Sequence, residues 1–306
     1  MKTVKQILAA MLFLMVLTGA ALAADMSQVR GYDKDSEQEY QYLLMGTYPY
    51  EEDGTEAPLL WRILGREEDT IHLFTEYLID VRQVFEVDNY KAAKAHKYPK
   101  GVTFEETDLY AWVNGEMTQT ILKNEDFSAA IVEAGGGKFH IMDNTEMRRT
   151  DWGFPDNTMG NIIENPGEVI AVNAKNRKGW GTPYAKAVRL YPDWGGKPRD
   201  RLFLFREYGS SSPYWSAKMR TSMCGIIGGN GHLSWSGCGD VQKGVRPALV
   251  LDLTKLEITG GTGTLEDPWT MKVKDGAEDG SGETPEGEAG AEAESGEDAE
   301  SEGREA

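Results

Sequence analysis

The side chains of this chain that are best suited to ligand binding gather in one stretch near its end, residues 210–243, which is dense in Gly, Ser and Trp. Aromatic rings in such a loop can stack on sugars or on ligand cations, and Trp235 is a better candidate for exposure than Tyr214 or Trp215. The alternative is that these rings anchor the loop in the core. The polar residues that complete this candidate ligand site are Arg220, Asn230, His232 and Asp240.

The two cysteines of the chain, Cys224 and Cys238, lie in the same stretch and are separated by a Gly-rich segment. Outside the cytosol, paired cysteines tend to close into a disulfide. Closing a loop of this length contributes roughly 3 kcal/mol in the chain-entropy model. We therefore expect a Cys224–Cys238 disulfide that staples a loop with little apolar content of its own.

Patterns typical of a catalytic or metal centre are missing from the sequence. Ser234, His232 and Asp240 are close in sequence, but no Gly-x-Ser-x-Gly elbow accompanies them. The four histidines are scattered, without a His-x-x-x-His or Cys-x-x-Cys pair. Adjacent acids such as Glu105-Glu106 fall in turns or at a helix start, where solvation explains them better than glycosidase chemistry. We expect neither a metal nor another cofactor, and ligand binding more than catalysis.

An apolar run directly after this stretch has the length and β-branched content of a buried strand. Pro247 lacks an amide N–H and therefore suits the first position of that strand. Arg246 precedes it, and a guanidinium beside a core strand must be paired. We expect Arg246 to be buried and to bind a carboxylate or loop carbonyl groups, holding residues 210–243 against the strand.

The rest of the body should consist of short strands and short helices with long loops between them. Thr107 can cap a helix that ends at Asn114-Gly115, and Thr182-Pro183 can begin another. Trp61 and Trp112 fit core positions. Strands are expected at residues 43–49, 59–64, 70–75, 139–142 and 202–206, the second and third of which form a hairpin. This pattern predicts a single α+β domain and not a doubly wound α/β fold.

The two ends of the chain differ from the body. Residues 1–23 have the features of a secretory signal peptide, because Lys2 and Lys5 precede an apolar run and Ala21 and Ala23 suit the cleavage site. That run is too short to span a membrane. We therefore expect a secreted protein without a membrane span. The mature chain should have a loosely ordered polar leader over 24–39, a folded domain over 40–274 and a disordered acidic tail over 275–306.

The charge of the chain bears on its partners. The net charge is −18, of which the tail from Gly276 carries −11. The body is mildly acidic and has no basic stripe, so nucleic acid is not an expected partner. A glycan, a peptide or a cell-surface protein is expected in its place.

Six short motifs occur in order along the body. They are Gly46-Thr47-Tyr48-Pro49, Trp61-Arg62-Ile63-Leu64, Thr107-Asp108-Leu109-Tyr110-Ala111-Trp112-Val113-Asn114-Gly115, Thr182-Pro183-Tyr184-Ala185, Gly244-Val245-Arg246-Pro247-Ala248-Leu249 and Gly263-Thr264-Leu265-Glu266-Asp267-Pro268-Trp269. The set resembles a domain of unknown function that is common in secreted and surface proteins of Gram-positive, gut-type bacteria. The usual Trp-Trp-Leu-Arg segment of that family is missing, and residues 214–220 are its nearest equivalent.

That family resembles the C-type-lectin-like fold, in the branch shared with formylglycine-generating enzymes, which also end with a Gly-x-Arg strand after a Gly/Ser/Asn-rich loop. The resemblance implies that late loops carry the ligand face. The leading hypothesis is a secreted, non-catalytic binding module with a loop-built site before the last core strand. The alternative implied by the resemblance is a copper-type oxidase that uses Cys224 and Cys238 as thiolates. A structural surface protein is a third hypothesis, but no anchor, repeat or sorting signal supports it.

Overall fold

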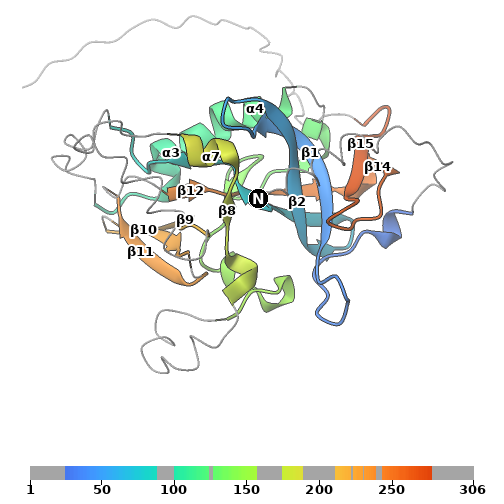
Figure 1. Cartoon of the computed structure of the whole chain (residues 1–306), viewed down its shortest axis with the longest axis horizontal. Helices are drawn as coiled ribbons and strands as arrows, with labels where there is room; N and C mark the ends of the chain where they lie inside the picture. Colours follow the sequence, from blue (N-terminus) through green and yellow to red (C-terminus); the bar gives the residue numbers. More distant parts are fainter. Residues whose placement is uncertain are drawn as a thin grey trace, which may run out of the picture.

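Two mixed β-sheets, a two-stranded ladder and a set of short helices form the described part of the chain (Figure 1). The computed structural model describes residues 25–87, 100–123, 127–156, 174–188, 211–221, 223–229, 231–238 and 243–277. The α+β class predicted from the sequence is confirmed. The predicted signal peptide, the predicted strand at 202–206 and nearly all of the acidic tail lie outside the described residues.

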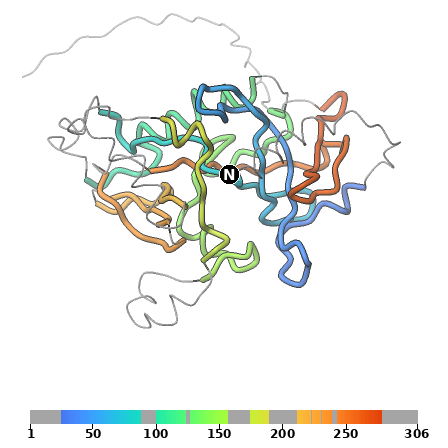
Figure 2. Tube along the Cα trace, in the orientation of Figure 1, coloured from blue at the N-terminus to red at the C-terminus, as the bar shows by residue number. Residues whose placement is uncertain are grey.

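The larger sheet has eight strands among the described residues, in the order β14-β15-β1-β2-β3-β13-β6, with β7 also paired to β13. Their bounds are β14 Leu256–Gly260, β15 Trp269–Val273, β1 Gln41–Pro49, β2 Glu56–Glu67, β3 Thr70–Thr75, β13 Pro247–Asp252, β6 Ile131–Val132 and β7 His140–Ile141. Strands β2 and β3 form the predicted hairpin. Strand β13 begins at Pro247 and inserts between β3 on one side and β6 and β7 on the other. The last strand, β15, runs parallel to β1 and so joins the β14–β15 pair near the C-terminus to the first strand that the structure describes (Figure 2).

The smaller sheet corrects the expectation that residues 210–243 form a loop. In the described part of the chain it has five strands: β11 Leu233–Gly237, β10 Met223–Ile227, β9 Tyr214–Arg220, β12 Lys243–Val245 and β5 Asp80–Arg82. Strands β9, β10 and β11 pair as consecutive antiparallel neighbours. The backbone groups of this Gly- and Ser-rich segment are thus satisfied by a sheet ladder. A separate two-stranded ladder joins β4 Tyr77–Leu78 to β8 Trp180–Gly181.

The helices are short and several are 3₁₀ turns. They are η1 Met26–Gln28, η2 Phe104–Glu106, α3 Asp108–Trp112, η3 Val113–Met117, α4 Thr118–Leu122, η4 Phe127–Ala130, η5 Glu146–Arg148, η6 Thr150–Trp152, η7 Ala174–Arg177, α7 Pro183–Ala187 and η8 Leu253–Lys255. Thr107 caps α3 by accepting from the amide of Tyr110, and Thr182 caps α7 by accepting from that of Ala185. None of the helices that the structure describes is long and apolar enough to cross a bilayer.

The helix capped by Thr107 continues past the predicted end at Asn114-Gly115. Element η3 is a π-helical turn that contains both residues and leads directly into α4. Within this run, Val113, Met117 and Ile121 are all buried. Packing of this apolar face outweighs the local preference of Asn-Gly for a helix end, and the wider π turn accommodates the pair.

The core contains both tryptophans that the sequence placed there. Trp61 is fully buried in β2, and its indole N–H donates to the carbonyl of Met45 at 2.8 Å. Trp112 is buried at the end of α3, where the guanidinium of Arg82 lies 4.2 Å from its ring centroid. The Trp61 indole therefore joins β2 to β1, and the Trp112 ring joins α3 to β5.

The segment from residue 25 to 39 is packed against the body, which corrects the expectation of a loosely ordered leader. Val29 is 1 % exposed and belongs to the main core. The amide of Arg30 donates to Gln41 Oε1 at 2.8 Å, and the amide of Tyr32 donates to the Leu64 carbonyl at 3.0 Å. The polar composition hid these anchors, because a single buried valine leaves no periodic signal.

A buried acid between the two sheets yields a pH-dependent prediction. Tyr48 donates its hydroxyl hydrogen bond to Asp80 Oδ2 at 2.7 Å, and Asp80 is 1 % exposed. Burial raises the pKa of Asp80, and the charge of Arg82 and the Tyr48 hydrogen bond oppose that rise. Tyr48→Phe should therefore raise the folded-state pKa of Asp80 further and lower the unfolding free energy by about 2 kcal/mol at pH 7.

This cost should be smaller at pH 4. A carboxyl whose folded-state pKa is raised takes up a proton more readily when folded, so stability falls as pH rises through that pKa. Urea unfolding at pH 4 and pH 7 measures the difference. In an Asp80→Asn background the cost of Tyr48→Phe should not depend on pH, and an equal cost at both pH values in the wild-type background would contradict the prediction.

Candidate functional site

Two of the aromatic residues predicted to bind ligand are buried. Tyr214 and Trp215 are both fully shielded from solvent at the start of β9. The Tyr214 hydroxyl donates to the Arg177 carbonyl at 2.7 Å, and the Trp215 indole donates to the Arg82 carbonyl at 2.8 Å. They anchor β9 to other segments, so the expectation that their ring faces meet a ligand is corrected.

The other predicted ligand-binding residues are spread over the small sheet. Arg220 is exposed at the end of β9, and His232 and Trp235 are half-buried before and within β11. Asn230 and Asp240 lie outside the described residues. None of the described members of this set lines either of the two cavities presented below.

The expected disulfide is not formed. Cys224 on β10 faces Ser236 on β11, and Cys238 follows two residues later, so the two cysteines are diagonal and not directly opposite. Diagonal neighbours of an antiparallel pair are farther apart than opposed ones. Both cysteines are buried, and Cys224 Sγ donates to the Ser216 carbonyl at 3.4 Å. Burial raises the pKa of the Cys224 thiol and keeps it protonated.

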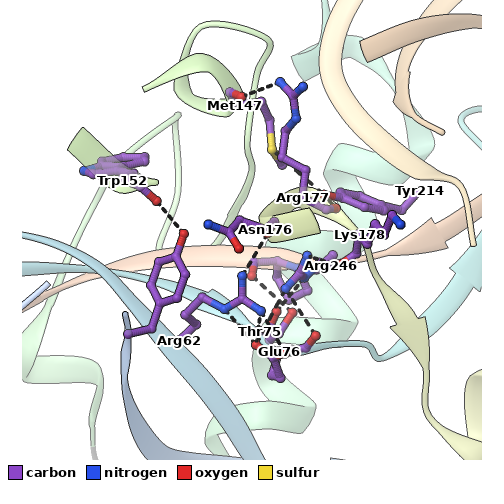
Figure 3. Close-up of polar contacts among 12 residues, drawn as sticks. Arg62, Thr75, Glu76, Met147, Trp152, Asn176, Arg177, Lys178, Tyr214 and Arg246 are labelled. Atoms are coloured by element: carbon purple, nitrogen blue, oxygen red, sulfur yellow. Dashed lines mark hydrogen bonds and ion pairs between the residues drawn. The ribbon is translucent and has the colours of Figure 1, made fainter. Parts of the chain in front are cut away.

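Arg246 is fully buried at the entrance to β13 (Figure 3). Its Nε donates to the Thr75 carbonyl at 2.6 Å, and its terminal nitrogens donate to the carbonyls of Lys178 and Glu76, each at 3.2 Å. The guanidinium lies 3.9 Å from the ring centroid of Phe74. Arg246 thus ties the junction of β3 and β4 and the segment after η7 to β13. Its guanidinium also lies 5.7 Å from the ring centroid of Tyr214, so it contacts residues 210–243 as expected from the sequence.

A second buried arginine extends this network. Arg62 makes a bidentate contact with Glu76, with both N···O distances 2.8 Å, and donates to the Asn176 carbonyl at 2.8 Å. Its guanidinium lies 4.6 Å from the ring centroid of Tyr40, whose hydroxyl donates to the Trp152 carbonyl at 2.8 Å. Figure 3 shows Arg62 and Trp152 in the same network as Arg246. The network therefore reaches from the last core strand to η6.

Trp152 also lines a cavity of about 510 Å³, here called the Arg66 pocket. The cavity forms where the N-terminal segment, the end of β2 and η6 meet. Its lining residues are Ser27, Val29, Arg30, Gly31, Tyr32, Gly65, Arg66, Glu67, Arg149, Asp151 and Trp152. Three guanidiniums and two carboxylates give this lining a net positive charge in an acidic protein.

The three arginines of the Arg66 pocket are held in different ways. Arg149 pairs with Asp151 and Glu67, and these contacts lower the pKa of both acids. Arg66 donates to the carbonyls of Met26, Val29 and Glu68, and Arg30 donates to the Ser36 hydroxyl and to the carbonyls of Gly31, Gln38 and Glu39. Neither Arg30 nor Arg66 has a carboxylate partner among the described residues. Their charges are thus positioned by carbonyl groups but not neutralised.

The floor of the Arg66 pocket depends on a close approach of backbone to an indole ring. A Cβ on Gly65 would lie 2.4 Å from Trp152 Nε1, so only glycine fits there. Trp152 is 2 % exposed, with Arg149 over its ring at 3.9 Å and His72 against it at 4.8 Å. Its Nε1 has no hydrogen-bond partner among the described residues.

Sequence reasoning missed the Arg66 pocket because its residues come from three segments, 27–32, 65–67 and 149–152. None of these segments carries a motif or a period. The available signal was the run Arg148-Arg149-Thr150-Asp151-Trp152, which places two cations, an acid and an indole together.

No group of three or more His, Cys, Asp or Glu side chains in the described part of the chain is arranged to hold a metal ion. Comparison of the chain with protein-family models, with curated proteins and with solved structures gives no match.

The buried guanidinium of Arg246 gives a stability prediction. Arg246→Met should lower the unfolding free energy by on the order of 3 kcal/mol, because one buried and two partly buried carbonyl groups lose their donor. Urea unfolding measures this. Arg220→Met, at an exposed position of β9, is the matched control and should change stability by less than about 0.5 kcal/mol. Equal, small effects of both substitutions would show that the network does not hold β13.

Proposed function

We propose that this chain is an exported, non-catalytic binding module of the C-type-lectin-like type that binds acidic glycans in the Arg66 pocket. The observation that carries the proposal is the pair of guanidiniums, Arg30 and Arg66, that line the cavity without a carboxylate partner among the described residues. Guanidinium groups bind carboxylates and sulfates with directed, charge-assisted hydrogen bonds. A ligand that carries carboxylate or sulfate groups would neutralise the positive charges of Arg30 and Arg66.

The size and lining of the Arg66 pocket support a glycan more than an apolar ligand. A volume of about 510 Å³ lies within the usual range for small-molecule sites. The lining offers hydroxyl, guanidinium and carboxylate groups, while the indole faces of Trp152 are already covered by Arg149 and His72. Recognition would therefore depend on hydrogen bonds and charge and not on stacking.

The amino-acid sequence supports both the C-type-lectin-like type and the export of the chain. The C-type-lectin-like type is supported by the six ordered motifs, and the last of the strands that they predict, β13, does follow Arg246 in a mixed α+β structure. Export is supported by the features of residues 1–23. In this proposal the ligand site lies at the N-terminal segment and η6, and not in residues 210–243.

A copper-type oxidase is the second candidate. It is favoured by two buried cysteines, one on β10 and one directly after β11, that are not joined by a disulfide. It is opposed by the burial that raises the pKa of the Cys224 thiol, because copper is bound by the thiolate. One copper ion retained per reduced chain, with loss of copper in Cys224→Ser, would favour this candidate over the binding module.

The binding proposal is tested with a glycan array followed by titration calorimetry on the strongest hit. We expect acidic glycans to bind, their neutral counterparts not to bind, and the affinity to fall as salt rises. Arg149→Gln removes one of the three lining guanidiniums and leaves the carboxylates of Glu67 and Asp151 in the lining without their guanidinium partner, so it should weaken the binding of an acidic ligand about tenfold.

The neighbouring residue supplies the control. Arg148 pairs with Asp156 outside the lining of the Arg66 pocket, so Arg148→Gln should leave the affinity within about twofold of the wild type. Equal weakening by both substitutions would mean that glycan affinity depends on the overall charge of the protein and not on the Arg66 pocket. Binding of acidic peptides but not of acidic glycans would show that the ligand class is wrong. Failure to bind any acidic ligand would refute the proposal.

A further inference from the structure

A second cavity of about 200 Å³, here called the His140 pocket, lies between β7, η2 and the helix that starts at α3. It is separate from the Arg66 pocket and shares none of its lining residues. The lining residues are Phe104, Glu105, Tyr110, Val113, Gly135, His140, Ile141, Asp143, Glu146 and Ala217.

His140 is fixed in this wall by a carboxylate. Its Nε2 lies 2.9 Å from Glu146 Oε1, and the other oxygen of Glu146 accepts the amide of Asp143 at 2.9 Å. Gly135, at φ 60°, packs against the ring, because a Cβ there would lie 2.9 Å from that of His140. Burial alone would raise the pKa of Glu146, but the hydrogen bond from His140 holds it below its ordinary value. Glu146 is therefore the anionic partner that orients the imidazole.

The other ring nitrogen of His140 is unpartnered. His140 is 8 % exposed, and its Nδ1 has no hydrogen-bond partner among the described residues. In the neutral tautomer that donates Nε2–H to Glu146, Nδ1 carries a lone pair that can accept one hydrogen bond. An unmet buried acceptor carries a desolvation cost, which a ligand donor in the cavity would remove.

The surroundings of this acceptor select for positive charge. Three carboxylates, those of Glu105, Asp143 and Glu146, line the cavity, and its described lining includes no Lys or Arg. The rings of Phe104 and Tyr110 meet edge to face at 6.2 Å, and aromatic faces attract cations. The Tyr110 hydroxyl is already donated to the Gly136 carbonyl at 2.7 Å, so it does not compete for Nδ1.

We propose that the His140 pocket binds a primary alkylammonium group, which donates one N–H to His140 Nδ1 and is neutralised by the surrounding carboxylates. The cavity has room for about six water-sized groups, which suits a short aliphatic stem with its ammonium head. Val113, Ile141 and Ala217 would contact such a stem, whereas they leave the hydroxyl groups of an amino sugar without partners. The inference does not depend on the glycan proposal, since the two cavities share no residue.

The test observes the imidazole itself. Long-range proton–nitrogen NMR spectra of the full chain, assigned with a His140→Gln variant, report both ring nitrogens. Without ligand, we expect the signal of an unprotonated Nδ1. Titration with n-propylammonium should shift this signal in the direction of a hydrogen-bonded acceptor, whereas 1-propanol, which has the same stem and no charge, should leave it in place.

Charge variants separate this site from general attraction to an acidic protein. Glu105 is exposed and lines the pocket, so Glu105→Gln should weaken n-propylammonium binding about threefold to fivefold. Glu133 is equally exposed and lies outside the lining, so Glu133→Gln should leave the affinity within about twofold. His140→Gln should abolish binding while a melting curve reports whether the variant is folded.

Three results would overturn the proposal. The first is an Nδ1 signal that does not respond to n-propylammonium, which would mean that this nitrogen is satisfied by water alone. The second is binding of glucosamine without binding of n-propylammonium, which would assign the cavity to amino sugars. The third is equal weakening by Glu105→Gln and Glu133→Gln, which would mean that the net charge of the protein, and not the His140 pocket, attracts n-propylammonium.

Discussion

A guanidinium shielded from water must have its N–H groups accepted by the protein, and Arg246 imposes this requirement on segments that are far apart in sequence. Its acceptors are the carbonyls of Thr75, Glu76 and Lys178. The first two lie where β3 gives way to β4, and the third follows η7. None of these segments can move away from the start of β13 without leaving a buried cation or a buried carbonyl unpaired. The ring of Phe74 covers the guanidinium and supports the exclusion of water.

The same constraint extends to the Arg66 pocket through contacts of a different kind. Glu76 accepts two hydrogen bonds from Arg62, Arg62 lies over Tyr40, and Tyr40 donates to the carbonyl of Trp152. In a medium of low dielectric, each of these contacts is stronger than it would be at the surface and is more costly to break. The indole of Trp152 is therefore placed by core electrostatics. Of the lining arginines, Arg149 is held by two carboxylates, and Arg30 and Arg66 are held mainly by backbone carbonyls. The resulting cavity has a rigid floor and a polar rim.

The sequence predicted local features well and non-local ones poorly. The β2–β3 hairpin, the Thr107 cap and the strand that starts at Pro247 all follow from residues close together in the chain. Residues 210–243 were misread as a loop because Gly and Ser have low strand propensity, and β9 to β11 are held by pairing that composition does not reveal. The diagonal register that separates Cys224 from Cys238 is also a property of that pairing. Neither cavity could be found, because each collects residues from segments whose proximity is decided only by the fold.

One short segment contributes to both cavities and gives them opposite charge. Glu146 in η5 faces His140 in the acidic cavity, while Arg149, Asp151 and Trp152, in and next to η6, line the basic one. The turn between the two elements is fixed by backbone hydrogen bonds from the amide of Arg149 to the Glu146 carbonyl and from the amide of Trp152 to the Arg149 carbonyl. A shift of this segment would change the geometry of both sites together. The buried network ends on the Trp152 carbonyl and therefore stabilises the position of this segment, so the core arginines influence the charge pattern of both cavities.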